Sequence, residues 1–266
     1  MLSDLFKKGS VLHVITGPCV IEDEEHTLRC AESLVRMFAK WPCKLIFKAS
    51  YDKANRSSHR SYRGPGIDQG LAILEKVRNT FAIPVTADIH HPEEAEKAAL
   101  LDIIQIPAFL CRQTDLLAAA AKTGRWVNIK KGQFLSPWEM QHVVEKVRNA
   151  GGEKILLTER GTMFGYNNLV SDMRAIVIMQ SLGLPVCFDA SHSVQLPGAA
   201  GSSSGGERQF IPALSRSAIA LGVQALFIES HPNPAQALSD QNTVYSFEDL
   251  EVLMEELLPL YELCQA

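Results

Sequence analysis

Apolar runs rich in β-branched residues recur along this chain and alternate with segments whose apolar residues have helical spacing. The runs cover residues 11–20, 43–49, 84–90, 103–109, 126–132, 154–160, 184–192 and 225–231. Their length and composition predict eight strands. The segments between them predict helices, as in the one that places Leu71, Leu74 and Val77 on a single face. Strand and helix therefore alternate throughout the chain.

Capping signals mark two of the predicted helices. Residues 136–139 read Ser-Pro-Trp-Glu, which gives an N-cap, a proline at the first helical position and a capping-box glutamate. Ser246 and Asp249 repeat the spacing before the last predicted helix. Gly151 and Gly152 mark the end of the helix that begins near residue 136.

The order of the elements predicts a (β/α)₈ TIM barrel. Eight strand–helix units fit within 266 residues, and no linker rich in proline, glycine or serine separates two halves. An open doubly wound sheet is the alternative, but no G-x-G-x-x-G motif follows the first strand. We therefore expect one α/β domain over residues 1–266, with its active site at the C-terminal ends of the strands.

Titratable side chains gather where the predicted strands end. They are Cys19, Lys48, Asp88 with His90, Lys130 with Lys131, Arg160, Asp189 with His192, and Glu229. Only the fourth run ends without one, at Ala108. Polar groups are ordinary at any single strand end, but the C-terminal rim of a barrel is where its catalytic groups lie. Their recurrence therefore favours an enzyme.

The charge of the chain indicates a small anionic ligand. The formal net charge is −4, yet residues 47–66 carry two lysines and three arginines within a loop-like sequence punctuated by glycine and proline. A nucleic-acid surface would need basic residues along an extended patch and a higher isoelectric point than about 6.1. We expect no nucleic-acid partner.

Two groups of rim residues follow from strand adjacency. Closure of the barrel brings strand eight beside strand one, so Cys19, His192 and Glu229 should converge, and Asp240 from the next loop could join them. Sulfur, imidazole and carboxylate suit a first-row transition metal. The alternative for Cys19 is a small buried hydrophobe.

The second group is cationic and comes from strands two, five and six and the loop after strand two. It comprises Lys48, Lys53, Lys130 and Arg160. Several positive charges around one cavity need a substrate with several negative charges. A phosphorylated carboxylic acid, or two phosphorylated molecules, would satisfy them.

Five motifs closely resemble the 3-deoxy-D-manno-octulosonate 8-phosphate synthase family. They begin at Lys48 (KASYDKANRSSHRSYRGPG), Gln105 (QIPAFLCRQTDLL), Asn128 (NIKKGQF), Thr158 (TERGTMFGYNNL) and Phe188 (FDASHSVQLPG). The resemblance extends over about residues 12–240. It implies a barrel transferase that condenses phosphoenolpyruvate with D-arabinose 5-phosphate and releases inorganic phosphate, on the pathway to lipopolysaccharide.

The resemblance also assigns roles to individual positions. It implies that the carboxylate and phosphate of phosphoenolpyruvate bind to Lys48, Lys53, Lys130 and Arg160, in a pocket also lined by Gln105 and Ala108. It places Asn55 and Asp88 at the aldehyde end of the pentose, and Arg56 and Ser57 at its phosphate. Arg112 would reach the active site of a neighbouring subunit, which implies a homo-oligomer, usually a tetramer.

The family has metal-dependent and metal-independent forms. The Gly17-Pro18-Cys19 sequence resembles the metal-dependent form, whereas the other form has asparagine at the cysteine position. The resemblance therefore implies one divalent ion per subunit, Zn²⁺, Fe²⁺ or Mn²⁺, held by Cys19, His192, Glu229 and Asp240. His192 and Asp240 are also candidate proton carriers. The loop 197–206 is more serine-rich than the family pattern.

Two other functions are weighed against this one. The related 3-deoxy-D-arabino-heptulosonate 7-phosphate synthases use erythrose 4-phosphate, but their second loop reads K-P-R-T where this chain has K-A-N-R-S-S. A non-catalytic sugar-phosphate sensor would need the anion-binding loops but not the four candidate metal ligands.

The sequence also carries expectations about location. No apolar run reaches the roughly 18 residues of a membrane span. Lys7 and Lys8 faintly resemble the start of a signal peptide, but the apolar run after them holds the first strand and Cys19. We expect a cytoplasmic protein without a membrane partner, whose six cysteines remain thiols.

Overall fold

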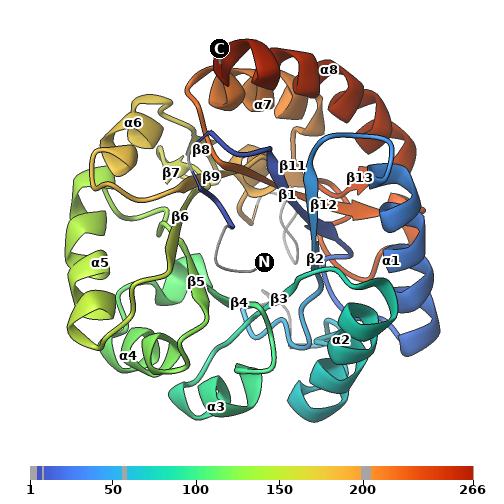
Figure 1. The fold of residues 1–266 in the computed structure, drawn as a ribbon, viewed down its shortest axis with the longest axis horizontal. Helices are drawn as coiled ribbons and strands as arrows, with labels where there is room; N and C mark the ends of the chain where they lie inside the picture. Colours follow the sequence, from blue (N-terminus) through green and yellow to red (C-terminus); the bar gives the residue numbers. More distant parts are fainter. Residues whose placement is uncertain (1–4, 8, 56–58, 199–204, 266) are drawn as a thin grey trace.

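A closed barrel of eight parallel strands forms the centre of the protein (Figure 1). The computed structural model describes residues 5–7, 9–55, 59–198 and 205–265. In these residues the barrel strands are β1 (His13–Gly17), β2 (Lys44–Lys48), β3 (Val85–Asp88), β4 (Ile103–Ile106), β5 (Trp126–Lys130), β6 (Ile155–Glu159), β9 (Val186–Asp189) and β12 (Ala225–His231). They pair in chain order, and β12 pairs with β1 to close the barrel. The predicted TIM barrel is confirmed.

Helices surround the barrel, one after each strand (Figure 1). Over the described residues they are α1 (Glu24–Phe38), α2 (Ile67–Phe81), α3 (Ala95–Ala98), α4 (Thr114–Lys122), α5 (Met140–Asn149), α6 (Arg174–Gln180), α7 (Ile211–Ala220) and α8 (Phe247–Gln265). The capping box of Ser136 and Glu139 is confirmed, although a 3₁₀ turn at Pro137–Glu139 precedes α5. The Ser246 hydroxyl accepts the Asp249 N–H at 2.9 Å, as the spacing predicts.

The hydrophobic core has two parts. One lies between the outer face of the barrel and the helices, and the other fills the barrel interior with residues such as Ile15, Ile46 and Phe227. The N-terminal segment joins the inner part, because the Phe6 ring packs against His13 and Trp126 at the starts of β1 and β5. This packing covers the N-terminal end of the barrel, so ligands must enter from the C-terminal end.

Short strands add structure to the connections at that end. They are β7 (Thr162–Met163) with β8 (Leu169–Val170), β10 (Gln195–Leu196) with β11 (Gly205–Gly206), and β13 (Tyr245–Ser246) beside the end of β12. The alternation pattern did not predict them, since two-residue strands are too short to show a period. Among the described residues, no helix combines the length and the apolar composition needed to cross a bilayer.

Candidate active site

A cleft of about 480 Å³, its open mouth included, lies at the C-terminal ends of the strands. Its lining contains many of the predicted site residues: Lys48, Lys53, Asn55, Asp88, Gln105, Ala108, Lys130, Arg160, His192 and Glu229. These residues come from or follow β2, β3, β4, β5, β6, β9 and β12. The strand ends that carry these residues therefore meet around one cavity.

Glu229 is the carboxylate at the centre of the cationic group. Its Oε1 lies 2.8 Å from Lys48 Nζ and 3.5 Å from Lys53 Nζ, and all three side chains are buried. Burial alone would raise the pKa of Glu229, but Lys48 and Lys53 lower it well below its ordinary range. Removal of one partner from such a pair costs about 3–5 kcal/mol, because a buried charge remains unpaired.

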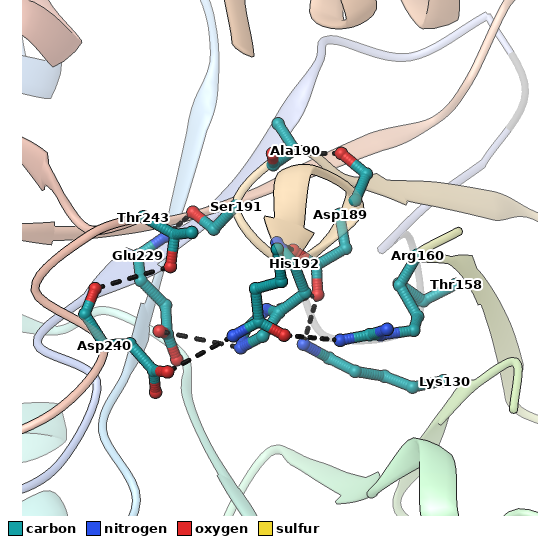
Figure 2. A network of polar contacts seen from close by, with 12 residues as sticks. Lys130, Thr158, Arg160, Asp189, Ala190, Ser191, His192, Glu229, Asp240 and Thr243 are labelled. Atoms are coloured by element: carbon teal, nitrogen blue, oxygen red, sulfur yellow. Dashed lines mark hydrogen bonds and ion pairs between the residues drawn. The ribbon is translucent and has the colours of Figure 1, made fainter. Parts of the chain in front are cut away.

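Asp189 joins the two groups of site residues. Its Oδ2 lies 2.5 Å from Lys130 Nζ and 2.8 Å from His192 Nδ1, and its Oδ1 accepts the His192 backbone N–H (Figure 2). Burial would raise the pKa of Asp189, but His192 and Lys130 lower it. Because Nδ1 pairs with Asp189, Nε2 is the ring nitrogen that faces Glu229 Oε2, 3.7 Å away.

The residues around Glu229 Oε2 fit a bound cation. This oxygen is buried and has no hydrogen-bond partner, and His192 Nε2 lies 3.7 Å from it. Donor atoms of Cys19, Glu229 and Asp240 all lie within 4.8 Å of one another. Burial and the Glu229 carboxylate raise the pKa of the Cys19 thiol, which donates to Asp240 Oδ2 at 3.0 Å. A divalent ion with S and O ligands would suit these three groups, and His192 Nε2 lies next to the set, 3.7 Å from Glu229 Oε2.

Arg160 lines the cleft and has one unpaired donor nitrogen. Its Nη2 donates to Gln195 Oε1 at 2.9 Å, whereas its Nη1 is buried without a hydrogen-bond partner. Gln195 in turn donates to Asp240 Oδ1 at 3.2 Å. Burial lowers the pKa of Arg160, but a guanidinium stays charged at neutral pH. An anionic oxygen in the cleft would pair the open N–H.

Several predicted site residues lie elsewhere. Arg56 and Ser57 fall outside the described residues, as do positions 199–204 of the serine-rich loop. Arg112 is exposed and does not line the cleft of its own subunit; its backbone carbonyl accepts from Lys146 Nζ at 2.7 Å. Cys19 and Asp240 lie close to Glu229 but are not among the residues that line the cleft.

A second cluster of potential ligands lies beside the start of α1. It contains Glu22, His26 and His231, with donor atoms within 4.8 Å of one another. However, His231 Nδ1 accepts the Asn233 backbone N–H at 3.0 Å, so the ring proton lies on Nε2. That N–H faces Glu22 Oε1 at 3.3 Å. His231 Nδ1 is therefore already engaged as a hydrogen-bond acceptor.

Comparison with known proteins places the chain in a family. Residues 6–264 match the family described as the DAHP synthetase I family. The chain belongs to the DAHP synthetase I family. The match spans the whole barrel, including every strand that contributes to the cleft.

Several known proteins are similar to this chain over nearly their full length. A protein of Protochlamydia amoebophila (strain UWE25) is 58% identical over 255 residues, which are 96% of this chain and 93% of the relative. A protein of Geobacter sp. (strain M21) is 56% identical, covering 94% and 92%, and one of Alkalilimnicola ehrlichii is 53% identical, covering 94% and 90%. All three are named 2-dehydro-3-deoxyphosphooctonate aldolase.

Some residues of this site were given no role from the sequence, although His90 and Asp189 were placed at strand ends. His90, Phe109 and Gln133 line the cleft, while Asp189 and Gln195 hold its charged groups. Asp189 had a usable signal, because it ends a strand and precedes His192 by three residues. Gln195 had none, because its role depends on how the chain turns after β9.

Proposed function

We propose that this protein condenses phosphoenolpyruvate with D-arabinose 5-phosphate and water, giving 3-deoxy-D-manno-octulosonate 8-phosphate and inorganic phosphate. The observation that carries the proposal is a cleft with four buried cationic groups, one of which, Arg160, has an open N–H. Such a cleft suits a small substrate with both carboxylate and phosphate. The name of the relatives supports a phosphorylated octonate as the product. The reaction would supply a lipopolysaccharide precursor.

In this proposal the phosphoenolpyruvate carboxylate and phosphate bind to Lys48, Lys53, Lys130 and Arg160, next to Gln105 and Ala108. Burial alone would lower the pKa of Lys53, but nearby acidic groups, Glu229 and Asp240 among them, raise it well above its ordinary range. Lys53 therefore stays charged. Fixed cations stabilise the charge that develops as C3 of phosphoenolpyruvate attacks the aldehyde and water adds at C2.

The pentose would lie at the other side of the cleft. We propose that Asn55 and Asp88 hold its aldehyde end, and that Arg56 and Ser57 bind its phosphate. Asp88 accepts from Ser50 at 2.9 Å and from Gln105, so its carboxylate is fixed in position. Lys48 and Lys53 lower its pKa against the effect of burial, which keeps it ionised as a hydrogen-bond acceptor.

We propose that the enzyme is metal-dependent, with Cys19, His192, Glu229 and Asp240 holding one Zn²⁺, Fe²⁺ or Mn²⁺ ion. A bound divalent ion would supply Lewis acidity and orientation at the reacting oxygen. Asp189 fixes the His192 ring so that Nε2 faces Glu229. His192 and Asp240 are also placed to carry protons within the site.

The heptulosonate reaction and the sensor function are not favoured. Against the heptulosonate reaction, the K-A-N-R-S-S sequence and the octonate in the name of the relatives support a five-carbon sugar as the acceptor. Against the sensor, the possible metal ligands around Glu229 suit catalysis. The test is to incubate the purified protein with both substrates and measure phosphate and octulosonate product together. We expect one phosphate per product and no release when the pentose is omitted. Binding without turnover would support the sensor.

We also propose a homo-oligomer, a tetramer, in which Arg112 completes the site of a neighbouring subunit. Exposed apolar side chains in the connections after β4, β5 and β6 support a protein partner on this side: Phe109, Phe134, Trp138, Phe164 and Tyr166. Inactive Arg112→Ala and inactive Lys130→Ala subunits, when mixed, should form some sites that carry neither lesion. The expected result is recovered activity. Mixed oligomers that are verified by mass and stay inactive would contradict a shared site.

Finally, we propose that residues 1–266 act as one domain in the cytoplasm. The family match over residues 6–264 supports one unit. The six cysteines are free thiols, which supports a reducing compartment.

A further inference from the structure

Four buried polar side chains form a chain of hydrogen bonds across the barrel interior. Thr158 Oγ1 donates to Asn128 Oδ1 at 2.6 Å, Asn128 Nδ2 donates to Gln105 Oε1 at 3.0 Å, and Gln105 Nε2 donates to Asp88 Oδ1. The chain crosses β6, β5, β4 and β3. Asp88 and Gln105, and Gln105 and Asn128, are paired positions on neighbouring strands. Only Asp88 and Gln105 line the cleft.

The direction of each hydrogen bond follows from the charge on Asp88. Its ionised carboxylate accepts hydrogen bonds and cannot donate one. Gln105 must therefore face Asp88 with its NH₂ group, which turns its carbonyl toward Asn128. Asn128 must meet that carbonyl with its own NH₂ group, so its carbonyl faces the hydroxyl of Thr158. A reversed amide at either position would bring two acceptors together in a buried site.

We propose that Asn128 is a positioning residue: it holds the carbonyl of Gln105 and so keeps the Gln105 NH₂ group turned toward Asp88 and the cleft. An NH₂ group has two N–H donors, so Gln105 keeps one for a ligand while the other bonds to Asp88. A donor at this place suits an anionic oxygen of the substrate, whereas a carbonyl would repel it. The identity of that anion rests on the proposed function. Asn128 itself does not line the cleft.

The replacement Asn128→Asp tests this role through its pH dependence. An ionised carboxylate at this position can only accept, so Gln105 would lie between two carboxylates and its carbonyl would face an acceptor in either orientation, while a protonated one can donate to Gln105 as the amide does. Burial raises the pKa of such a carboxyl. At about pH 8 we expect kcat/KM for phosphoenolpyruvate to fall by at least about tenfold relative to wild type, and to recover toward wild type by about pH 6. Asn128→Leu, of similar size, should be impaired at both pH values.

No neighbouring group should produce the same pH dependence. Thr158 and Gln105, which face Asn128 directly, do not titrate. Asp88 stays ionised because nearby lysines lower its pKa, and Cys187, which contacts Thr158, stays a thiol because burial raises its pKa. Identical pH profiles for the two Asn128 variants, or wild-type kinetics in both, would overturn the proposal.

A second pair of variants covers the case in which Asn128→Asp does not fold. Thr158→Val keeps the shape but removes the hydroxyl that fixes Asn128, whereas Thr158→Ser retains it. We expect a loss of several-fold or more in phosphoenolpyruvate affinity for Thr158→Val and near wild-type affinity for Thr158→Ser. Equal affinities in a folded pair would contradict the proposal. Calorimetric binding of phosphoenolpyruvate is the readout, so the result does not depend on whether wild type condenses both substrates.

Discussion

Metal-stripped protein is expected to lose essentially all condensation activity, and Zn²⁺, Fe²⁺ or Mn²⁺ should restore it. Cys19→Ser should bind metal more weakly and turn over roughly 100-fold more slowly or worse. A hydroxyl is a poor substitute for a thiolate as a metal ligand. Even replacement of a residue that only hydrogen-bonds to a metal ligand typically lowers metal affinity or activity by about 10- to 100-fold. Metal content by elemental analysis and phosphate release should be measured on the same samples. Cys111→Ser is the matched control, since Cys111 is buried but lies outside the donor set around Glu229.

A third cysteine variant separates ligation from packing. Cys19→Asn imitates the metal-independent form of the family that the sequence resembles, so any activity it retains should be insensitive to chelator. If that activity is low, the metal-independent form requires substitutions at other positions besides Cys19. Wild-type protein that is shown to be metal-free and still turns over at the full rate would contradict metal dependence, and Cys19 would then be a core cysteine.

Arg160→Met is expected to lower kcat/KM for phosphoenolpyruvate by about 100-fold, mainly through KM. The variant removes the open Nη1 donor and one buried positive charge, and hydrogen bonds to charged groups are typically worth about 1.5–3 kcal/mol each. Arg160→Lys keeps the charge but has no second guanidinium nitrogen to donate to Gln195. It should therefore recover only part of the lost kcat/KM.

The matched control for this arginine is Arg174→Met. Arg174 is exposed on α6 and pairs with Asp172, away from the cleft. Thermal unfolding should be compared for all the variants, because the replacement of Arg160 also leaves Gln195 without a donor. An Arg160→Met protein that folds and keeps the wild-type KM for phosphoenolpyruvate would contradict its assignment to the anion.

The fold and much of the site could be predicted from the sequence because a parallel barrel places all strand C-termini on one rim. Lys48, Lys130 and Glu229 each end or nearly end an apolar run, so the pattern that locates the strand also locates the side chain. Barrel closure then brings Cys19 beside Glu229, although 210 positions separate them in the chain. No local signal was needed for that step.

Contacts that depend on side-chain direction could not be predicted in this way. Asn128 lies in the strand WVNIK, where the pattern indicates burial but not which atoms its amide meets. Gln195 reaches Arg160 and Asp240 only because of how the chain turns after β9. The Phe6 packing that covers the opposite end of the barrel also lacks a sequence signal, because one aromatic residue near a terminus has no periodicity.

The measurement that tests the central claim most directly is a comparison of acceptor sugars. Purified protein with phosphoenolpyruvate and added divalent metal should be assayed for kcat/KM with D-arabinose 5-phosphate and with D-erythrose 4-phosphate, by phosphate release and by product mass. We expect a clear preference for the pentose and a product with eight carbons. An equal or higher kcat/KM with erythrose 4-phosphate would contradict the octulosonate function, even though the chain would remain a member of its family.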